Sequence, residues 1–185
     1  MLVFGTTVVP PSFDKLVSDS DYIVRAVVKS VVSEMRNDGK NRHIITKIEL
    51  DVREVINGNP PQQLVLEMLG GKVGVEEMVV EGSPKFQVGD EDVLFIRGNK
   101  KQFNPLVALM FGRYPIKREA GTGREYVVRT NGAALYDEKE VSLPMSDAGT
   151  QRLSAVPDSQ PLSVTDFVSR IRTSARNSPR SVQPN

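Results

Sequence analysis

Apolar and polar residues alternate along much of the segment between residues 22 and 136, and this two-residue period is typical of β-strands with one buried face. In the clearest stretch, three apolar side chains point to one face and four charged ones to the other: Ile48, Leu50 and Val52 against Lys47, Glu49, Asp51 and Arg53. One face of this strand is therefore expected in the core and the other in water, as in an antiparallel sheet.

Turn sequences divide this pattern into separate strands. The Asn-Asp-Gly-Lys sequence at residues 37–40 predicts a tight hairpin, because Asp-Gly tolerates a positive φ. Val55 and Ile56 break the alternation, which predicts a bulge or a strand end before the turn at residues 57–61. An uninterrupted apolar run at residues 93–96 indicates a strand buried on both faces. Further strands are expected at residues 22–29, 64–68, 78–80, 106–111, 126–129 and 133–136.

Two short helices are expected to flank the strands. Ser12 can cap a helix over residues 12–17, and Ser163, followed three residues later by Asp166, can cap a second helix that docks on the strands. The polar sequence after residue 172 predicts a flexible tail. The expected organisation is an N-terminal extension (1–11), one β-barrel domain with flanking helices (12–172) and a tail (173–185).

The spacing of the strands indicates the fold class. Seven or eight strands with turns at short intervals are typical of an antiparallel sandwich or barrel. Helices do not alternate with strands, so a doubly wound α/β fold is disfavoured. The sequence therefore predicts a mainly β protein, and 185 residues suffice for one such domain.

Charge and cysteine content exclude several classes of function. The net charge is +1, from 24 basic and 23 acidic residues. The chain therefore lacks the excess of basic residues that most nucleic-acid-binding proteins have. The chain has no cysteine, and this excludes disulfides, thiol nucleophiles, thiolate metal sites and iron–sulfur clusters. No run of about 18 apolar residues is present, so no transmembrane helix is expected.

Several sequence features follow one another in a recognisable order within residues 12–117. A short helix and a long first strand precede Val-Arg-Glu-Val-Ile-Asn-Gly at 52–58, a Gly-Gly loop at 70–71, and Gly-Ser-Pro-Lys-Phe-Gln-Val-Gly-Asp at 82–90. This order resembles that of a group of bacterial, often exported, proteins of unknown function, whose layout is similar to the netrin-like, OB-type barrel of tissue inhibitors of metalloproteases. The resemblance implies that barrel. The inhibitors chelate the protease zinc through an N-terminal cysteine that this chain lacks, so their activity is not implied.

Residues suited to catalysis are few. The single histidine, His43, has no second histidine with which to form a metal site or a relay, and it is expected to be a polar residue beside the hairpin. Gly70, Gly71 and Lys72 lack the Ser or Thr and the following helix of a phosphate-binding loop, and are expected in a hairpin or barrel corner. The acidic clusters at 19–21, 90–92 and 137–140 do not match a calcium loop. No catalytic residue, metal ligand or cofactor is assigned.

Two short segments are candidate contact surfaces. The basic loop at residues 97–103 carries Lys100, Lys101 and Phe103. The turn at residues 111–115 carries Phe111, Arg113 and Tyr114, and arginine and tyrosine are favoured residue types at protein interfaces.

These observations leave three hypotheses for function. The first is a non-catalytic binding module, exported to the periplasm or the extracellular space, whose partner is an unidentified protein or envelope ligand. Its alternatives are an OB-type protein that binds single-stranded nucleic acid, and a glycosidase-type enzyme that uses two carboxylates. The apolar stretch after Met1 is compatible with a trimmed export signal, and a cytoplasmic protein is the alternative. The sequence does not determine the oligomeric state.

Overall fold

A computed structural model describes residues 9–39, 41–145 and 160–177. Its main feature is a six-stranded antiparallel sheet in the order β3-β2-β1-β6-β7-β8. The strands are β1 (Tyr22–Asp38), β2 (Asn41–Gly58), β3 (Leu64–Leu69), β6 (Glu91–Ile96), β7 (Arg113–Arg118) and β8 (Glu125–Val127). A separate hairpin pairs β4 (Gly71–Val73) with β5 (Glu76–Met78). The mainly β, antiparallel character predicted from the sequence is confirmed.

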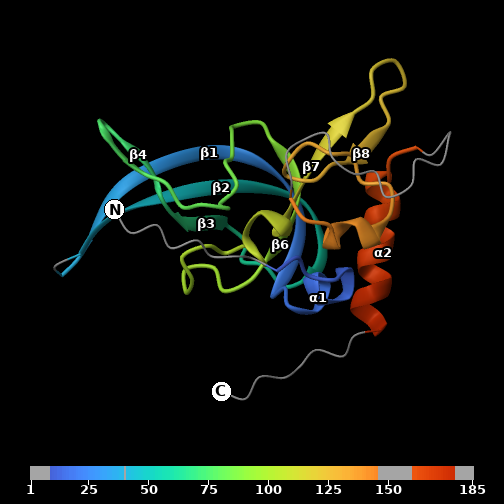
Figure 1. The fold of residues 1–185 in the computed structure, drawn as a ribbon, viewed down its shortest axis with the longest axis horizontal. Helices are drawn as coiled ribbons and strands as arrows, with labels where there is room; N and C mark the ends of the chain where they lie inside the picture. Colours follow the sequence, from blue (N-terminus) through green and yellow to red (C-terminus); the bar gives the residue numbers. More distant parts are fainter. Residues whose placement is uncertain (1–8, 40, 146–159, 178–185) are drawn as a thin grey trace.

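Within the described residues, the sheet is accompanied by four helical segments: α1 (Phe13–Ser18), η1 (Leu109–Gly112), η2 (Glu138–Ser142) and α2 (Val164–Asn177), of which η1 and η2 are 3₁₀ helices. Figure 1 shows β1 and β2 as two long, curved strands that cross the molecule, with α1 and α2 beside one end of the sheet. Within the described ranges no helix is long and apolar enough to cross a membrane.

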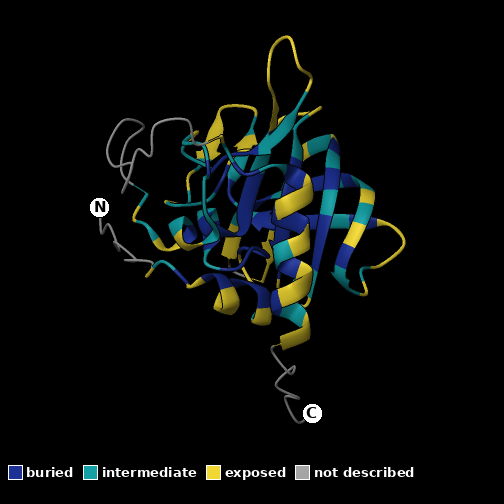
Figure 2. Ribbon diagram, turned by 90° about the vertical axis from the view of Figure 1, so that its right-hand side faces the viewer, coloured by how far each residue is buried: buried dark blue, intermediate teal, exposed yellow. Residues whose placement is uncertain are grey.

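Both faces of the central strands are buried, which the apolar run at 93–96 predicted. Val93 and Phe95 pack into a cluster that includes both α-helices, whereas Leu94 and Ile96 pack into a second cluster on the opposite, concave face. Figure 2 shows α2 with its exposed residues on one side and its buried residues toward the sheet. The sheet is therefore covered by helices on one face, while its other face is covered by loops.

The predicted hairpin and bulge are confirmed. β1 pairs with β2 along its whole length, from Tyr22 opposite Gly58 to Asp38 opposite Asn41. The register shifts between Ile23 and Val24, which places the extra residue of β2 at Ile56. Both α-helices begin as predicted, because Ser12 Oγ accepts from Lys15 N and Ser163 Oγ accepts from Asp166 N.

Several predictions about the fold were wrong. Residues 106–111 form a single bridge at Leu106 and then η1, because Ala108 and Leu109 adopt left-handed backbone angles that no strand contains. Only an isolated bridge occurs at residues 133–136, and the strand expected at 78–80 lies at 76–78. The barrel type stays a prediction, because strands β3 and β8 end the sheet without pairing to each other and no closed barrel is found among the described residues.

The end of α2 also differs from the prediction. The helix continues to Asn177, so the first five residues of the predicted flexible tail are helical. The reason is a long-range contact, since the buried Ser174 hydroxyl donates to Asp14 Oδ1 of α1 at 2.6 Å. The rest of the predicted tail, 178–185, and the extension up to residue 8 lie outside the described residues.

A buried hydroxyl in the helix-side cluster gives a testable prediction. Tyr114 is fully buried, its hydroxyl has no hydrogen-bond partner among the described residues, and burial raises its pKa. Tyr114→Phe is therefore expected to leave the free energy of unfolding unchanged, or to raise it by up to about 1 kcal/mol, in urea titration. Ser20→Ala, which removes the 2.8 Å hydrogen bond from the buried Ser20 hydroxyl to the Leu16 carbonyl, is the control that should lose stability. A loss in Tyr114→Phe as large as in the control would contradict the prediction.

Candidate functional site

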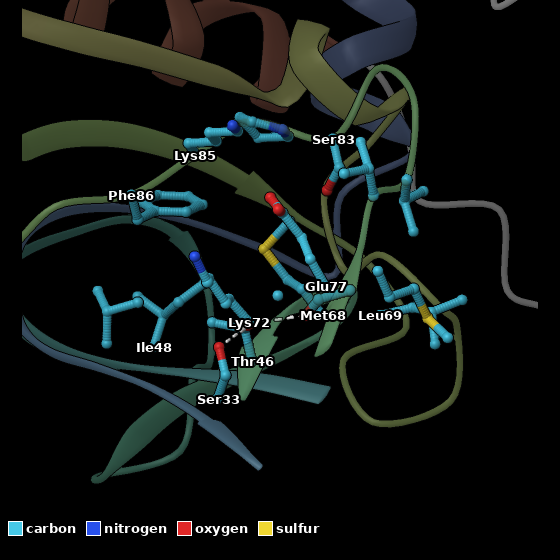
Figure 3. Close-up of a pocket in the computed structure, with 17 residues that line it drawn as sticks. Ser33, Thr46, Ile48, Met68, Leu69, Lys72, Glu77, Ser83, Lys85 and Phe86 are labelled. Atoms are coloured by element: carbon cyan, nitrogen blue, oxygen red, sulfur yellow. Dashed lines mark hydrogen bonds between the residues drawn. The ribbon is translucent and has the colours of Figure 1, made fainter. Parts of the chain in front are cut away.

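A cleft with a largely apolar lining lies on the concave face of the sheet (Figure 3). The β4–β5 hairpin and the segment at residues 79–86 border it opposite β1, β2 and β3. Its volume is about 280 Å³. This is near the lower end of the range for small-molecule sites, and corresponds to a compact ligand or a few side chains.

The floor of the cleft is apolar and follows from the alternation in the strands. Val31 of β1 lies directly opposite Ile48 of β2, and Met68 of β3 lies diagonally across from Ile48 on the same face. Phe86 closes one side and belongs to the same buried cluster as Ile48 and Met68. An apolar part of a ligand that packs against these side chains would displace water from them.

Two hydroxyls and two glycines bring the β4–β5 hairpin close to the sheet. Thr46 Oγ1 donates to the Gly70 carbonyl at 2.6 Å and lies 2.9 Å from Ser33 Oγ. A Cβ atom on Gly71 would lie 2.3 Å from Thr46 Oγ1 and 2.4 Å from Ser33 Oγ, so no larger residue fits there without displacement. The glycine pair therefore begins a hairpin, as predicted, and lets the backbone approach the sheet.

Arg113 holds the Phe86 side of the cleft in place. Its guanidinium carbon lies 4.2 Å from the centroid of the Phe86 ring, and the same group donates to the Lys85 carbonyl. It also donates to Asp92 Oδ1 at 2.8 Å and to Asp90 Oδ2 at 2.7 Å. Burial raises the pKa of Asp92, and the charge of Arg113 acts in the opposite direction. Arg113 is therefore a buried positioning residue.

This burial corrects the prediction of a contact surface at residues 111–115. Phe111, Arg113 and Tyr114 are only 3%, 6% and 0% exposed, so their side chains are not available to a partner on the protein surface. Sequence composition alone did not reveal that Arg113 has two carboxylate partners, because both lie more than 20 residues earlier in the chain.

Charged side chains stand at the rim of the cleft. Lys72 and Glu77 extend from β4 and β5 toward the side formed by Phe86, and Lys85 lies above that ring (Figure 3). All three are exposed, and none forms an ion pair with any described residue. Two lysines and one glutamate leave a net positive charge at the rim, and this favours an anionic group in the ligand.

The basic loop at residues 97–103 lies outside the cleft, and its side chains are exposed. Lys100, Lys101 and Phe103 are on the surface, with Phe103 55% exposed, so they could contact a partner. The loop covers the edge of β3, because Asn99 bonds to the backbone of that strand and the Phe103 carbonyl accepts from Leu69 N. Among the described aromatic residues only Phe103 is exposed, whereas single-strand binding by stacking uses several.

Among the described residues, Glu91 and Glu125 form a close carboxylate pair, but Glu125 lacks the raised pKa that a glycosidase acid needs. Glu91 and Glu125 both bind Arg25, at 2.7 and 2.8 Å. Burial acts to raise the pKa of Glu125, but hydrogen bonds from Arg118 and Arg25 lower it overall. A general acid requires a raised pKa, and Asp92, whose pKa is raised, is 0% exposed and does not reach a cleft.

His43 and the acidic clusters also show no metal site. His43 Nε2 lies 3.3 Å from Asp38 Oδ2 across the β1–β2 hairpin, which is the polar position predicted. In the described ranges no group of three or more His, Asp or Glu side chains could hold a metal ion.

The cleft was not predicted from the sequence. The stretch at residues 82–90 has the sequence of a turn. A lysine beside a phenylalanine in this turn, Lys85 and Phe86, is the one sequence feature that points to the cleft. Comparison with known proteins adds no assignment, since neither a scan against protein-family models nor a search of curated proteins finds a match.

Proposed function

We propose that this chain is a non-catalytic binding module, and that its cleft binds a ligand with an apolar part and an anionic group. The observation that carries the proposal is the combination of an apolar floor with rim lysines that have no ion-pair partner among the described residues. The floor supplies affinity by excluding water, and the lysines select the charge.

The architecture of the module and its export from the cell belong to the same proposal. A netrin-like or OB-type fold is supported by the long β1–β2 hairpin and by the two flanking helices, although the described strands do not close a barrel. Export is supported by the sequence resemblance and by the apolar stretch after Met1. Fractionation of the source cells, with the intact mass of the native protein, tests it: an uncleaved cytosolic protein would refute export.

Binding of 8-anilinonaphthalene-1-sulfonate tests the cleft, because this fluorescent probe combines apolar rings with one negative charge. The native protein is expected to bind one probe molecule. The double variant Lys72→Gln, Lys85→Gln is expected to bind it about fivefold more weakly, since two exposed charge interactions contribute roughly 1 kcal/mol together. Fluorescence titration at two salt concentrations measures both the loss and its screening.

A matched pair of lysines outside the cleft provides the control. Lys100→Gln, Lys101→Gln removes the same charge from the exposed loop beside β3, and is expected to leave the probe affinity unchanged. The proposal would be wrong if this control weakened binding as much as the cleft variant. It would equally be wrong if the cleft variant bound like the native protein, or if several probe molecules bound.

A further inference from the structure

One edge of the sheet is open next to the cleft. β6 pairs with β1 only from Tyr22 to Val27, whereas β1 continues to Asp38. Beyond the register shift between Val28 and Ser30, β1 pairs with β2 on one side and with none of the described strands on the other. The open stretch from residue 30 to residue 38 lies in the part of β1 far from the helices (Figure 1).

Three hydrogen bonds outside the β1–β2 ladder show which backbone groups point outward from this edge. Val28 N donates to Asp90 O and Gly89 N donates to Val28 O, so Val28 faces away from β2. Ile44 O accepts from Gly70 N, so Ile44 faces away from β1, and its register partner Met35 must face away from β2.

The backbone direction between these two positions follows from the alternation along a strand. The N–H and C=O groups of Val31, Ser33 and Met35 point out from the edge. None of them has a hydrogen-bond partner among the described residues. The row of free donors and acceptors has the spacing that an added strand would pair with.

The outer sides of the two terminal strands, β3 and β8, are covered. Asn99 accepts from Glu67 N and donates to Val65 O, which occupies the outer side of β3. On the outer side of β8, Val127 N donates to Leu162 O and Leu135 N donates to Val127 O. Natural sheets protect their edges in this way, and the edge of β1 beyond Lys29 lacks such cover among the described residues.

The open edge and the cleft share residues. Val31 and Ser33 supply outward backbone groups to the edge, and their side chains line the cleft. A strand added to this edge would continue the concave face, and every second side chain of that strand would point toward the cleft. The lysines at the rim would then face an acidic side chain of the added strand.

We propose that the ligand is an extended peptide segment of a partner protein, which adds to the open edge of β1 as a further strand. This inference rests on the proposed binding function and names its ligand class. Backbone hydrogen bonds to Val31, Ser33 and Met35 hold the peptide, while an apolar and an acidic side chain on its cleft-facing side give selectivity.

A synthetic peptide of known sequence tests the strand addition. Acetyl-Thr-Val-Thr-Glu-Thr-Val-Thr-amide places its valines and its glutamate on one face when extended. Two derivatives carry N-methyl groups on alternate amides, one on the odd and one on the even positions. Only one derivative keeps the amides that face β1, so calorimetry is expected to show binding by one of the two and a loss of about tenfold or more in the other.

Protein variants test the same contacts from the other side. Met35→Pro removes an N–H that faces outward, which an edge strand tolerates, and is expected to weaken peptide binding at least fivefold, roughly the effect of one lost hydrogen bond with local steric blocking. Met35→Leu keeps the N–H and should bind like the native protein. Both variants are expected to bind the naphthalene sulfonate normally, and circular dichroism checks that both fold.

The outcomes separate this inference from the proposed function. If the sulfonate probe binds through Lys72 and Lys85 but the peptide does not bind at millimolar concentration, the cleft stands and strand addition is overturned. Equal binding of both N-methylated derivatives, or of neither, also overturns it. If the protein sediments as a dimer that Met35→Pro dissociates, a second copy of the chain occupies the edge and the peptide proposal fails.

Discussion

Arg113→Met is expected to lower the free energy of unfolding by about 3–5 kcal/mol, because it leaves the wholly buried carboxylate of Asp92 without its counter-charge. One oxygen of that carboxylate, Oδ2, already has no hydrogen-bond partner in the described residues. Urea unfolding followed by circular dichroism measures the loss. The same variant is expected to weaken binding of the sulfonate probe, since Arg113 also fixes Lys85 and Phe86 at the cleft.

An exposed arginine and a double variant make this prediction specific. Arg118 pairs with Glu125 at 3.0 Å on the surface, and Arg118→Met is expected to cost at most about 1 kcal/mol. Adding Asp92→Leu to Arg113→Met removes the unpaired charge and is expected to restore part of the stability. A loss in Arg113→Met as small as in Arg118→Met would show that the buried pair is not what holds this part of the fold.

The sequence correctly predicted those elements whose structure depends only on residues adjacent in the chain. The hairpin at residues 37–40, the bulge near Ile56 and the caps at Ser12 and Ser163 each depend on a few adjacent side chains or on local backbone angles. Strand alternation also identified the buried face of β2 correctly, since Ile48 and Leu50 are in the core. Such features could be inferred without knowing which strands are neighbours.

Long-range contacts account for the predictions that were wrong. Residues 106–111 are apolar enough for a strand, but Leu109 and Phe111 are buried as part of a 3₁₀ helix. The hydrophobic pattern does not distinguish this backbone conformation from a strand. Arg113 looked like a surface residue because arginine usually is one, and only its pairing with β6 places it beside Asp92. The end of α2 is set by Asp14, which lies 160 residues away from Ser174.

The candidate site could not be predicted for the same reason. Its floor comes from three strands, and its rim comes from a hairpin and a loop that return over the concave face. Neither Lys72 nor Lys85 is unusual in the sequence, and they become informative only because the fold places both beside an apolar surface. The open edge of β1 was equally hidden, since it depends on where β6 stops pairing.

Phe167→Ala is expected to destabilise the protein by about 3–5 kcal/mol, as large aromatic-to-alanine changes in a core do. Phe167 is fully buried on α2, and its ring centroid lies 5.1 Å from that of Tyr114, 5.9 Å from Phe13 and 6.2 Å from Phe95. One side chain therefore connects both α-helices to β6 and β7. Thermal and urea unfolding measure the effect.

The matched control lies on the same helix. Ser169 is exposed on α2, and Ser169→Ala is expected to change stability by no more than about 0.5 kcal/mol. Because the aromatic cluster and the cleft lie on opposite faces of the sheet, the folded fraction of Phe167→Ala should still bind the sulfonate probe with native affinity. A large loss of affinity in folded Phe167→Ala would mean that the helices shape the cleft through the sheet. A loss of stability below about 1 kcal/mol would mean that α2 is not anchored by this ring.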